Sequence, residues 1–166
     1  MPSNLRLAEP LHDLIIQAMI DLLPVELAAL EAKYNDGISL PAPLSTSIYG
    51  YEVQQKPNLP AIFVEIPDIH MSERDTLGGY TSLTTVEILC IFGHVRPDVL
   101  HTMSHRYGEG IANCILPLSA ENGLQENGYM PTTPVRVNYA PQFKDTNTFI
   151  KSVMLTVTID TVEQAF

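Results

Sequence analysis

The sequence is poor in basic residues, and this scarcity argues against ordinary nucleic-acid binding. Nine Lys and Arg residues stand against 19 Asp and Glu residues, which gives a formal net charge of −10 at pH 7. The basic residues are spread thinly and never form a run. Binding to phosphate backbones requires clustered Lys and Arg that replace counterions. The charge balance instead indicates an acidic surface that repels nucleic acid.

The sequence also lacks long apolar runs, a leader segment and cysteine motifs. No apolar run approaches the roughly 18 residues that a membrane span needs. Residues 1–6 lack the basic start, apolar block and cleavage site of a secretory leader, so we expect folding in the cytoplasm. Cys90 and Cys114 lie in apolar patterns without CxxC spacing, which predicts two buried free thiols.

Motifs of catalysis and cofactor binding are missing as well. The sequence contains no GxSxG, and Gly78-Gly79 lacks the downstream Lys-Ser/Thr of a phosphate-binding loop. The acidic run around Asp68, Glu73 and Asp75 does not match a calcium-binding EF-hand loop. We therefore predict a protein that is not an enzyme and holds no cofactor.

One group of residues keeps a metal-dependent enzyme open as an alternative. His101 and His105 are four residues apart on a predicted helix, a spacing that can hold zinc, and His94 and Glu109 lie nearby in the sequence. A catalytic zinc site needs a third ligand and usually a Glu within HExxH, whereas residues 102–104 are Thr, Met and Ser. We expect two histidines on a solvated helix face.

Apolar periodicity predicts three helical segments. Residues 7–22 carry apolar side chains at spacings of three and four, and residues 25–34 continue with Pro24 in the first turn. The Asn-Asp-Gly sequence at 35–37 ends this second segment. A third helix runs from Pro97 to just before Pro117.

The third helix carries two further signals. Arg106 and Glu109 are three residues apart, which is a suitable spacing for a surface ion pair. Tyr107 falls on the apolar stripe of the helix, which predicts a position in the core.

Alternating patterns predict the strands. Residues 59–66 and 81–92 form a long β-hairpin whose polar outer part, residues 68–82, projects from the domain. Residues 135–143 and 149–159 form a closing pair of strands. Residues 38–59 are rich in Pro and Tyr, which predicts a long binding loop with a short strand within 48–53.

The order helix, hairpin, helix, hairpin predicts an α+β fold. In it an antiparallel or mixed β-sheet is packed on one face by helices, with a long projecting β-hairpin. No repeat, low-complexity segment or linker divides the chain, so residues 1–166 are expected to form a single domain.

Several elements together carry a family resemblance that spans nearly the full chain. They are the amphipathic N-terminal helix, the Pro-rich loop with its tyrosines, the strands LPAIFVEI and TTVEILCIF, the His105-Arg106-Tyr107 sequence ahead of Ile111, and the closing hairpin. This arrangement resembles the tail terminator (tail-completion) proteins of tailed bacteriophages and related neck proteins.

The resemblance implies a structural virion protein in the tail or neck, assembled in the host cytoplasm. Such proteins form a ring, usually a hexamer, that caps the tail tube, joins it to a neck or stopper protein and in some tails meets a sheath protein. DNA passes through the ring without specific binding, and neither a reaction nor a membrane is involved. The candidate interface residues lie in the loop and the projecting hairpin, where Tyr and Arg are typical of interfaces: Tyr49, Tyr51, Arg74, Leu77 and Tyr80.

Two further alternatives remain open beside the metal-dependent enzyme. The chain suits another neck component, such as a head–tail adaptor, a stopper or a tube-like protein. It also suits a bacterial protein that shares the fold and belongs to a prophage or a contractile injection device.

Overall fold

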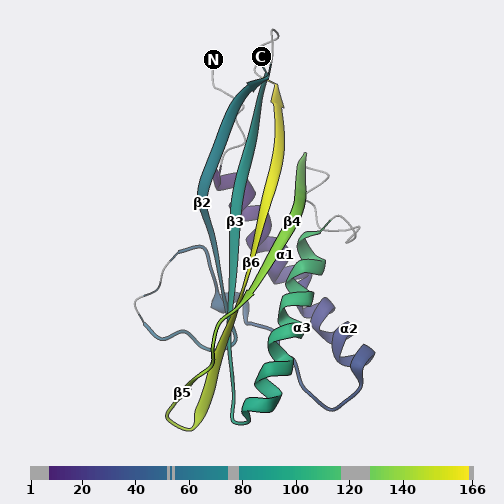
Figure 1. Cartoon of the computed structure of the whole chain (residues 1–166), viewed down its shortest axis with the longest axis vertical. Helices are drawn as coiled ribbons and strands as arrows, with labels where there is room; N and C mark the ends of the chain where they lie inside the picture. The colour runs from purple at the N-terminus through teal and green to yellow at the C-terminus, as the bar shows by residue number, and fades with distance from the viewer. Residues whose placement is uncertain (1–7, 52, 54, 75–78, 117–127, 165–166) are drawn as a thin grey trace.

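In the computed structural model, the helices pack on one face of a mixed sheet, which confirms the predicted α+β class (Figure 1). The structure describes residues 8–51, 53, 55–74, 79–116 and 128–164. The helices are α1 (Ala8–Asp21), α2 (Leu23–Tyr34) and α3 (Pro97–Ile115). A 3-10 turn (Ser45–Ser47) precedes the strands β1 (Ile48–Tyr49), β2 (Ala61–Arg74), β3 (Gly79–His94), β4 (Tyr129–Tyr139), β5 (Phe143–Asp145) and β6 (Thr148–Gln164).

The predicted helices are confirmed, together with their boundary signals. A proline stands in the first turn of both α2 and α3, where the missing N–H costs no hydrogen bond. Asn35 ends α2 in the left-handed region with φ 44°, and its N–H donates to the carbonyl of Glu31. None of the helices in the described ranges is both long and apolar enough to cross a membrane.

The sheet has the strand order β1-β2-β3-β6-β4, with β5 paired to β6. β1 is parallel to β2, and the other pairs are antiparallel. The predicted hairpin of β2 and β3 is present. However, β6 continues past the expected end at Ile159 and pairs with β3 as far as Gly79↔Gln164. The extension beyond the helices is therefore three-stranded rather than a two-stranded hairpin (Figure 1).

The strand expected at 135–143 differs from the prediction. It begins earlier, at Tyr129, and it is divided into β4 and the short β5. Pro141 lies between the two pieces, and proline has no N–H to donate to a sheet ladder.

The core lies between the helices and alternate residues of the central strands. Val86, Ile88, Cys90 and Phe92 of β3 are buried, as is Tyr107 of α3. The rings of Phe92 and Tyr107 are 4.7 Å apart between centroids, and the Tyr107 hydroxyl donates to the Pro41 carbonyl over 2.6 Å. The core position predicted for Tyr107 is thus confirmed.

Both cysteines are free and buried, as predicted. Burial raises the pKa of the Cys114 thiol to about 12, and burial also raises the pKa of the Cys90 thiol. Neither thiol has the depressed pKa of a nucleophile or a metal ligand.

Two glycines let α3 lie close to its neighbours. A Cβ added at Gly110 would lie 3.2 Å from the Leu27 side chain of α2. A Cβ added at Gly108 would lie 3.3 Å from Val137 of β4. The helix thus approaches α2 on one side and the sheet on the other.

Candidate interaction surfaces

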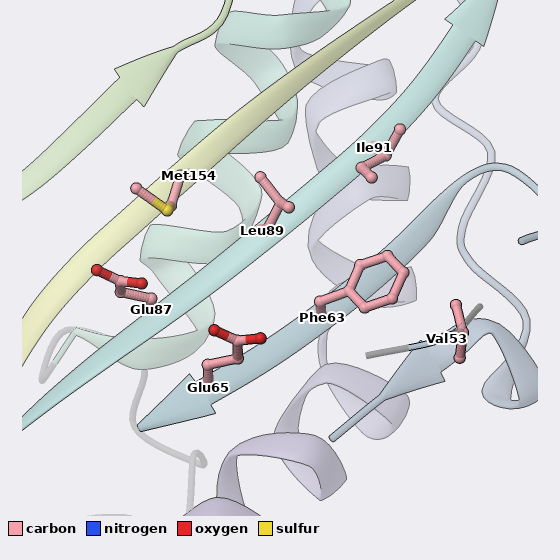
Figure 2. Close-up of a pocket in the computed structure, with 7 residues that line it drawn as sticks. All are labelled: Val53, Phe63, Glu65, Glu87, Leu89, Ile91 and Met154. Carbon is pink, nitrogen blue, oxygen red and sulfur yellow. The ribbon is translucent and has the colours of Figure 1, made fainter. Parts of the chain in front are cut away.

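The face of the sheet opposite the helices carries half-buried apolar side chains around a shallow hollow of about 290 Å³ (Figure 2). Figure 2 shows side chains of β2, β3 and β6 gathered there, with Val53 of the segment between β1 and β2 at the border. No helix in the described residues packs on this face (Figure 1). The lining residues are Val53, Phe63, Glu65, Glu87, Leu89, Ile91 and Met154. We call this region the open sheet face.

Strand register explains why these residues meet. Phe63 of β2 pairs with Leu89 of β3, and Leu89 pairs with Met154 of β6. Directly paired residues project from the same face of a sheet, so the three apolar side chains form one row. The sequence held a signal for this row, because residues 59–66 and 84–92 are apolar on both faces of their strands.

The next row of the open sheet face is acidic. Glu65 and Glu87 are direct cross-strand partners, and neither forms an ion pair within the described part of the chain. Arg136 lies in the same row on β4, but Thr156 of β6 stands between it and Glu87. Strands are about 4.7–4.9 Å apart, so Arg136 is two strand spacings away from Glu87.

Two of the predicted interface residues border this face. The Tyr49 ring stacks on Phe63, with 5.1 Å between centroids and 24° between planes. Tyr51 meets Tyr49 edge-on at 6.1 Å, and its side chain is exposed. Tyr49, Tyr51 and Phe63 thus form an aromatic group at the rim of the apolar row.

The other three predicted interface residues are not placed there. Arg74 and Tyr80 lie near the outer ends of β2 and β3, where Arg74 pairs with Gly79 and Glu73 with Tyr80. The orientations of the Arg74 and Tyr80 side chains, and the whole of Leu77, lie outside what the structure describes.

Both outer edges of the sheet offer backbone that pairs with no further strand among the described residues. β1 pairs with β2 only at Ile62 and Phe63. From Val64 to Arg74 no described strand pairs with the outer edge of β2, although His12 Nε2 lies 3.0 Å from the Val64 carbonyl oxygen. β4 forms the opposite edge. Free N–H and C=O groups along such edges are templates for pairing with another chain.

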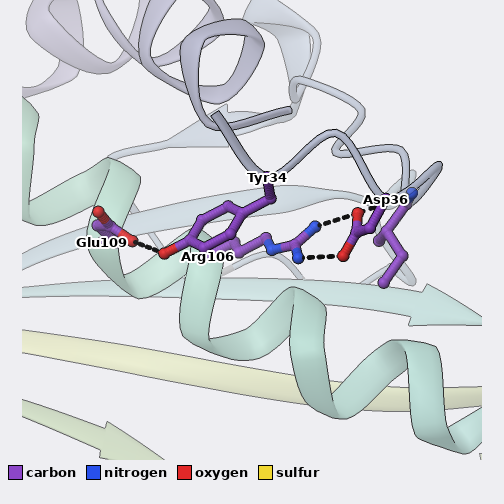
Figure 3. A network of polar contacts seen from close by, with 5 residues as sticks. Tyr34, Asp36, Arg106 and Glu109 are labelled. Carbon is purple, nitrogen blue, oxygen red and sulfur yellow. Dashed lines mark hydrogen bonds and ion pairs between the residues drawn. The ribbon is translucent and has the colours of Figure 1, made fainter. Parts of the chain in front are cut away.

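A polar network joins the end of α2 to α3 (Figure 3). The buried Arg106 guanidinium forms two hydrogen bonds with the Asp36 carboxylate and lies over the Tyr34 ring at 4.2 Å. Hydrogen bonds from Arg106 lower the pKa of Asp36 to about 2. The same pairing raises the pKa of Arg106.

The predicted ion pair between Arg106 and Glu109 is wrong. Glu109 instead accepts hydrogen bonds from Lys33 over 2.9 Å and from the Tyr34 hydroxyl over 3.0 Å, and these bonds lower its pKa. Because α2 packs against α3, Arg106 and Glu109 each bond to a residue about seventy positions away in the sequence rather than to each other. This network fixes the two helices to each other rather than forming a binding site.

The four residues of the metal-enzyme alternative are only partly brought together. His101 and His105 face each other on α3, with 3.4 Å between their Nε2 atoms. His94 instead accepts the backbone N–H of Arg96 at its Nδ1, and Glu109 is held by α2. Across the described ranges, no group of three or more His, Cys, Asp or Glu side chains is placed to hold a metal ion.

The sequence matches no protein-family model, and no curated protein matches it. A functional assignment therefore rests on the fold, the open sheet face and the sheet edges.

Proposed function

We propose that the protein is a structural virion protein, a tail terminator that forms a homo-oligomeric ring at the head-proximal end of the tail tube and joins the tail to the neck. The observation that carries the proposal is a sheet whose two edges are not paired with any other described strand, together with an apolar face that no described helix covers. A protein that works alone normally covers such edges and faces.

The positions of the edges suit a closed ring. β2 and β4 lie towards opposite sides of the sheet, so the β2 edge of one copy can pair with the β4 edge of the next. Such a head-to-tail contact uses two different surfaces and closes into a ring when its rotation is a fraction of a full turn. The resemblance to tail terminators favours a hexamer.

The open sheet face suits the second contact that a terminator needs, with the tail tube or the neck protein. Its apolar row would pack against apolar side chains of that partner. The adjacent Glu65 and Glu87 would meet a Lys or Arg, since both carboxylates lack a cation among the described residues. The net charge of −10 would let DNA pass through the ring without adhering.

Another neck component would use the same edges. A head–tail adaptor, a stopper or a tube-like protein also forms rings, and the edges of β2 and β4, which no further described strand covers, favour all of them equally. Antibody labelling of assembled particles separates these roles, because a terminator lies between the tail tube and the neck.

The mass of the purified protein, measured by light scattering, tests the proposal. We expect a ring of about six copies, or a monomer that becomes a ring when tail tubes are added. A stable monomer that responds to neither tube nor neck partner would contradict it.

A pair of proline variants tests the edge contact itself. Ile69 and His70 are neighbours on the open part of β2 and pair with Thr84 and Leu83 of β3. Successive residues of a strand direct their N–H groups to opposite edges. Of I69P and H70P, one therefore loses a hydrogen bond to β3 and the other loses a donor on the outer edge. We call these the inner and the outer variant. We expect the outer variant to fold but not to form the ring, and the inner variant to lose stability. Ring formation by both variants would rule out the edge contact.

A further inference from the structure

The exposed histidine pair of α3 has a geometry that the proposed assembly does not use. His101 and His105 are one helical turn apart, and both side chains are exposed to solvent. Their rings meet at 88° with 4.9 Å between centroids, and the two Nε2 atoms are 3.4 Å apart. The two Nε2 atoms thus lie within hydrogen-bonding distance of each other, and an ion bound by both would replace this contact.

The distance between the two Nε2 atoms equals the distance between two imidazole ligands of one zinc ion. A zinc ion lies ~2.0–2.1 Å from each imidazole nitrogen that binds it, so two such nitrogens at a tetrahedral angle are about 3.4 Å apart. The Nε2 atoms of His101 and His105 already have that separation. An ion bound by both Nε2 atoms would therefore not need to change the distance between them.

A neighbouring aromatic ring supports the arrangement. Tyr139 of β4 packs against the His105 ring with 4.8 Å between centroids. This contact restricts the rotation of the His105 side chain, and ligands that are oriented before binding lose less entropy when the ion arrives.

We propose that His101 and His105 together bind one divalent transition-metal ion of the zinc, nickel and copper class through their Nε2 atoms. Water fills the remaining coordination positions, since no third His, Cys, Asp or Glu is placed at the pair in the described residues. The site has two protein ligands and open positions, which differs from the four-ligand closed sites of structural zinc.

The ligand type predicts a selectivity that a general electrostatic attraction would not produce. Imidazole pairs bind Cu²⁺ more tightly than Ni²⁺ or Zn²⁺. Mg²⁺ and Ca²⁺ prefer oxygen ligands, so they should not bind at this pair. An acidic protein that merely attracts cations would bind Mg²⁺ as well as Zn²⁺.

Calorimetric titration of the full-length protein with ZnCl₂ and MgCl₂ tests the site. We expect one zinc ion per chain and no magnesium at the same site. H101Q and H105Q should each weaken zinc binding by about 100-fold, since the second imidazole acts at a high effective concentration. H70Q is the matched control, because His70 is an exposed histidine of β2 far from the pair in sequence. It should bind zinc like the wild type.

A thermal melt provides a second readout that does not depend on heat signals. Zinc that binds only the folded helix raises the melting temperature of the wild type and of H70Q, but not of H101Q or H105Q. Circular dichroism shows whether each variant is folded. Wild-type affinity in a folded H101Q or H105Q, or zinc binding that only H70Q removes, would overturn the proposal.

Discussion

Glu65 and Glu87 are direct cross-strand partners on the open sheet face, so two carboxylates stand side by side without a cation in the described residues. Like charges in this position destabilise a sheet by a few tenths of a kcal/mol. A chain that keeps such a pair next to an apolar row is less stable by this amount while no cation neutralises the pair. In the proposed assembly, a cationic side chain of the partner would neutralise this pair.

Glu87→Gln is therefore expected to raise the free energy of unfolding of the isolated protein by about 0.5 kcal/mol. Stability increases because the substitution removes the repulsion between the carboxylates of Glu87 and Glu65. Urea denaturation at low ionic strength measures it, and added salt should reduce it because salt screens the charges. In a Glu65→Gln background the same change should bring no further gain. Fully additive gains would show that the two carboxylates do not interact.

The Asp36–Arg106 pair predicts a loss of stability in acid. The pKa of Asp36 is lowered from 3.8 to about 2 in the folded protein, chiefly by its hydrogen bonds with Arg106. A depressed pKa means that the folded state holds the ionised form more strongly than the unfolded state does. The contribution of the Asp36–Arg106 pair to stability is thus fully present above pH 3.8 and is lost as the pH falls towards about 2.

Asp36→Asn should therefore lower stability at neutral pH and flatten the decline of stability between pH 3.8 and about pH 2. Urea unfolding at a series of pH values measures both effects. Asp68→Asn is the control, since Asp68 is exposed and forms no ion pair in the described ranges. An acid profile of Asp36→Asn that parallels the wild type would contradict the role assigned to the pair.

The hydrogen bond from the Tyr107 hydroxyl to the Pro41 carbonyl joins α3 to the loop that leads to β1. Tyr107→Phe keeps the ring and its packing on Phe92 but removes this bond. We expect a loss of about 1 kcal/mol in the free energy of unfolding, measured by thermal or urea denaturation. Tyr51→Phe changes an exposed ring and should have an effect within about 0.5 kcal/mol. Equal effects of the two changes would argue against the buried bond.

Burial of both cysteines predicts chemical inertness. Cys90 and Cys114 should not react with a maleimide or an aromatic disulfide reagent in the native protein, because burial raises the pKa of both thiols. After denaturation both should react. Thiol counting by absorbance or mass spectrometry measures the difference. Rapid labelling of either residue in the folded state would contradict the core positions.

The local patterns of the sequence were sufficient for the helices and for the outline of the sheet. The ends of α2, with Pro24 in the first turn and Asn35 beyond the last, follow from backbone preferences of single residues. The burial of Tyr107 and of both cysteines follows from apolar periodicity. These properties involve residues within a few positions of one another, so they can be predicted without the fold.

The tertiary structure alone decided which distant residues meet. Strand register placed Glu65 opposite Glu87 and put Phe63, Leu89 and Met154 in one row. Helix packing placed Arg106 against Asp36, so Arg106 pairs with Asp36 rather than with Glu109. The extension of β6 along β3 to Gln164 likewise depends on a neighbouring strand rather than on its own pattern. Local periodicity states only which face of an element a residue occupies. The partner across that face is determined by register and layer packing, which depend on the whole chain.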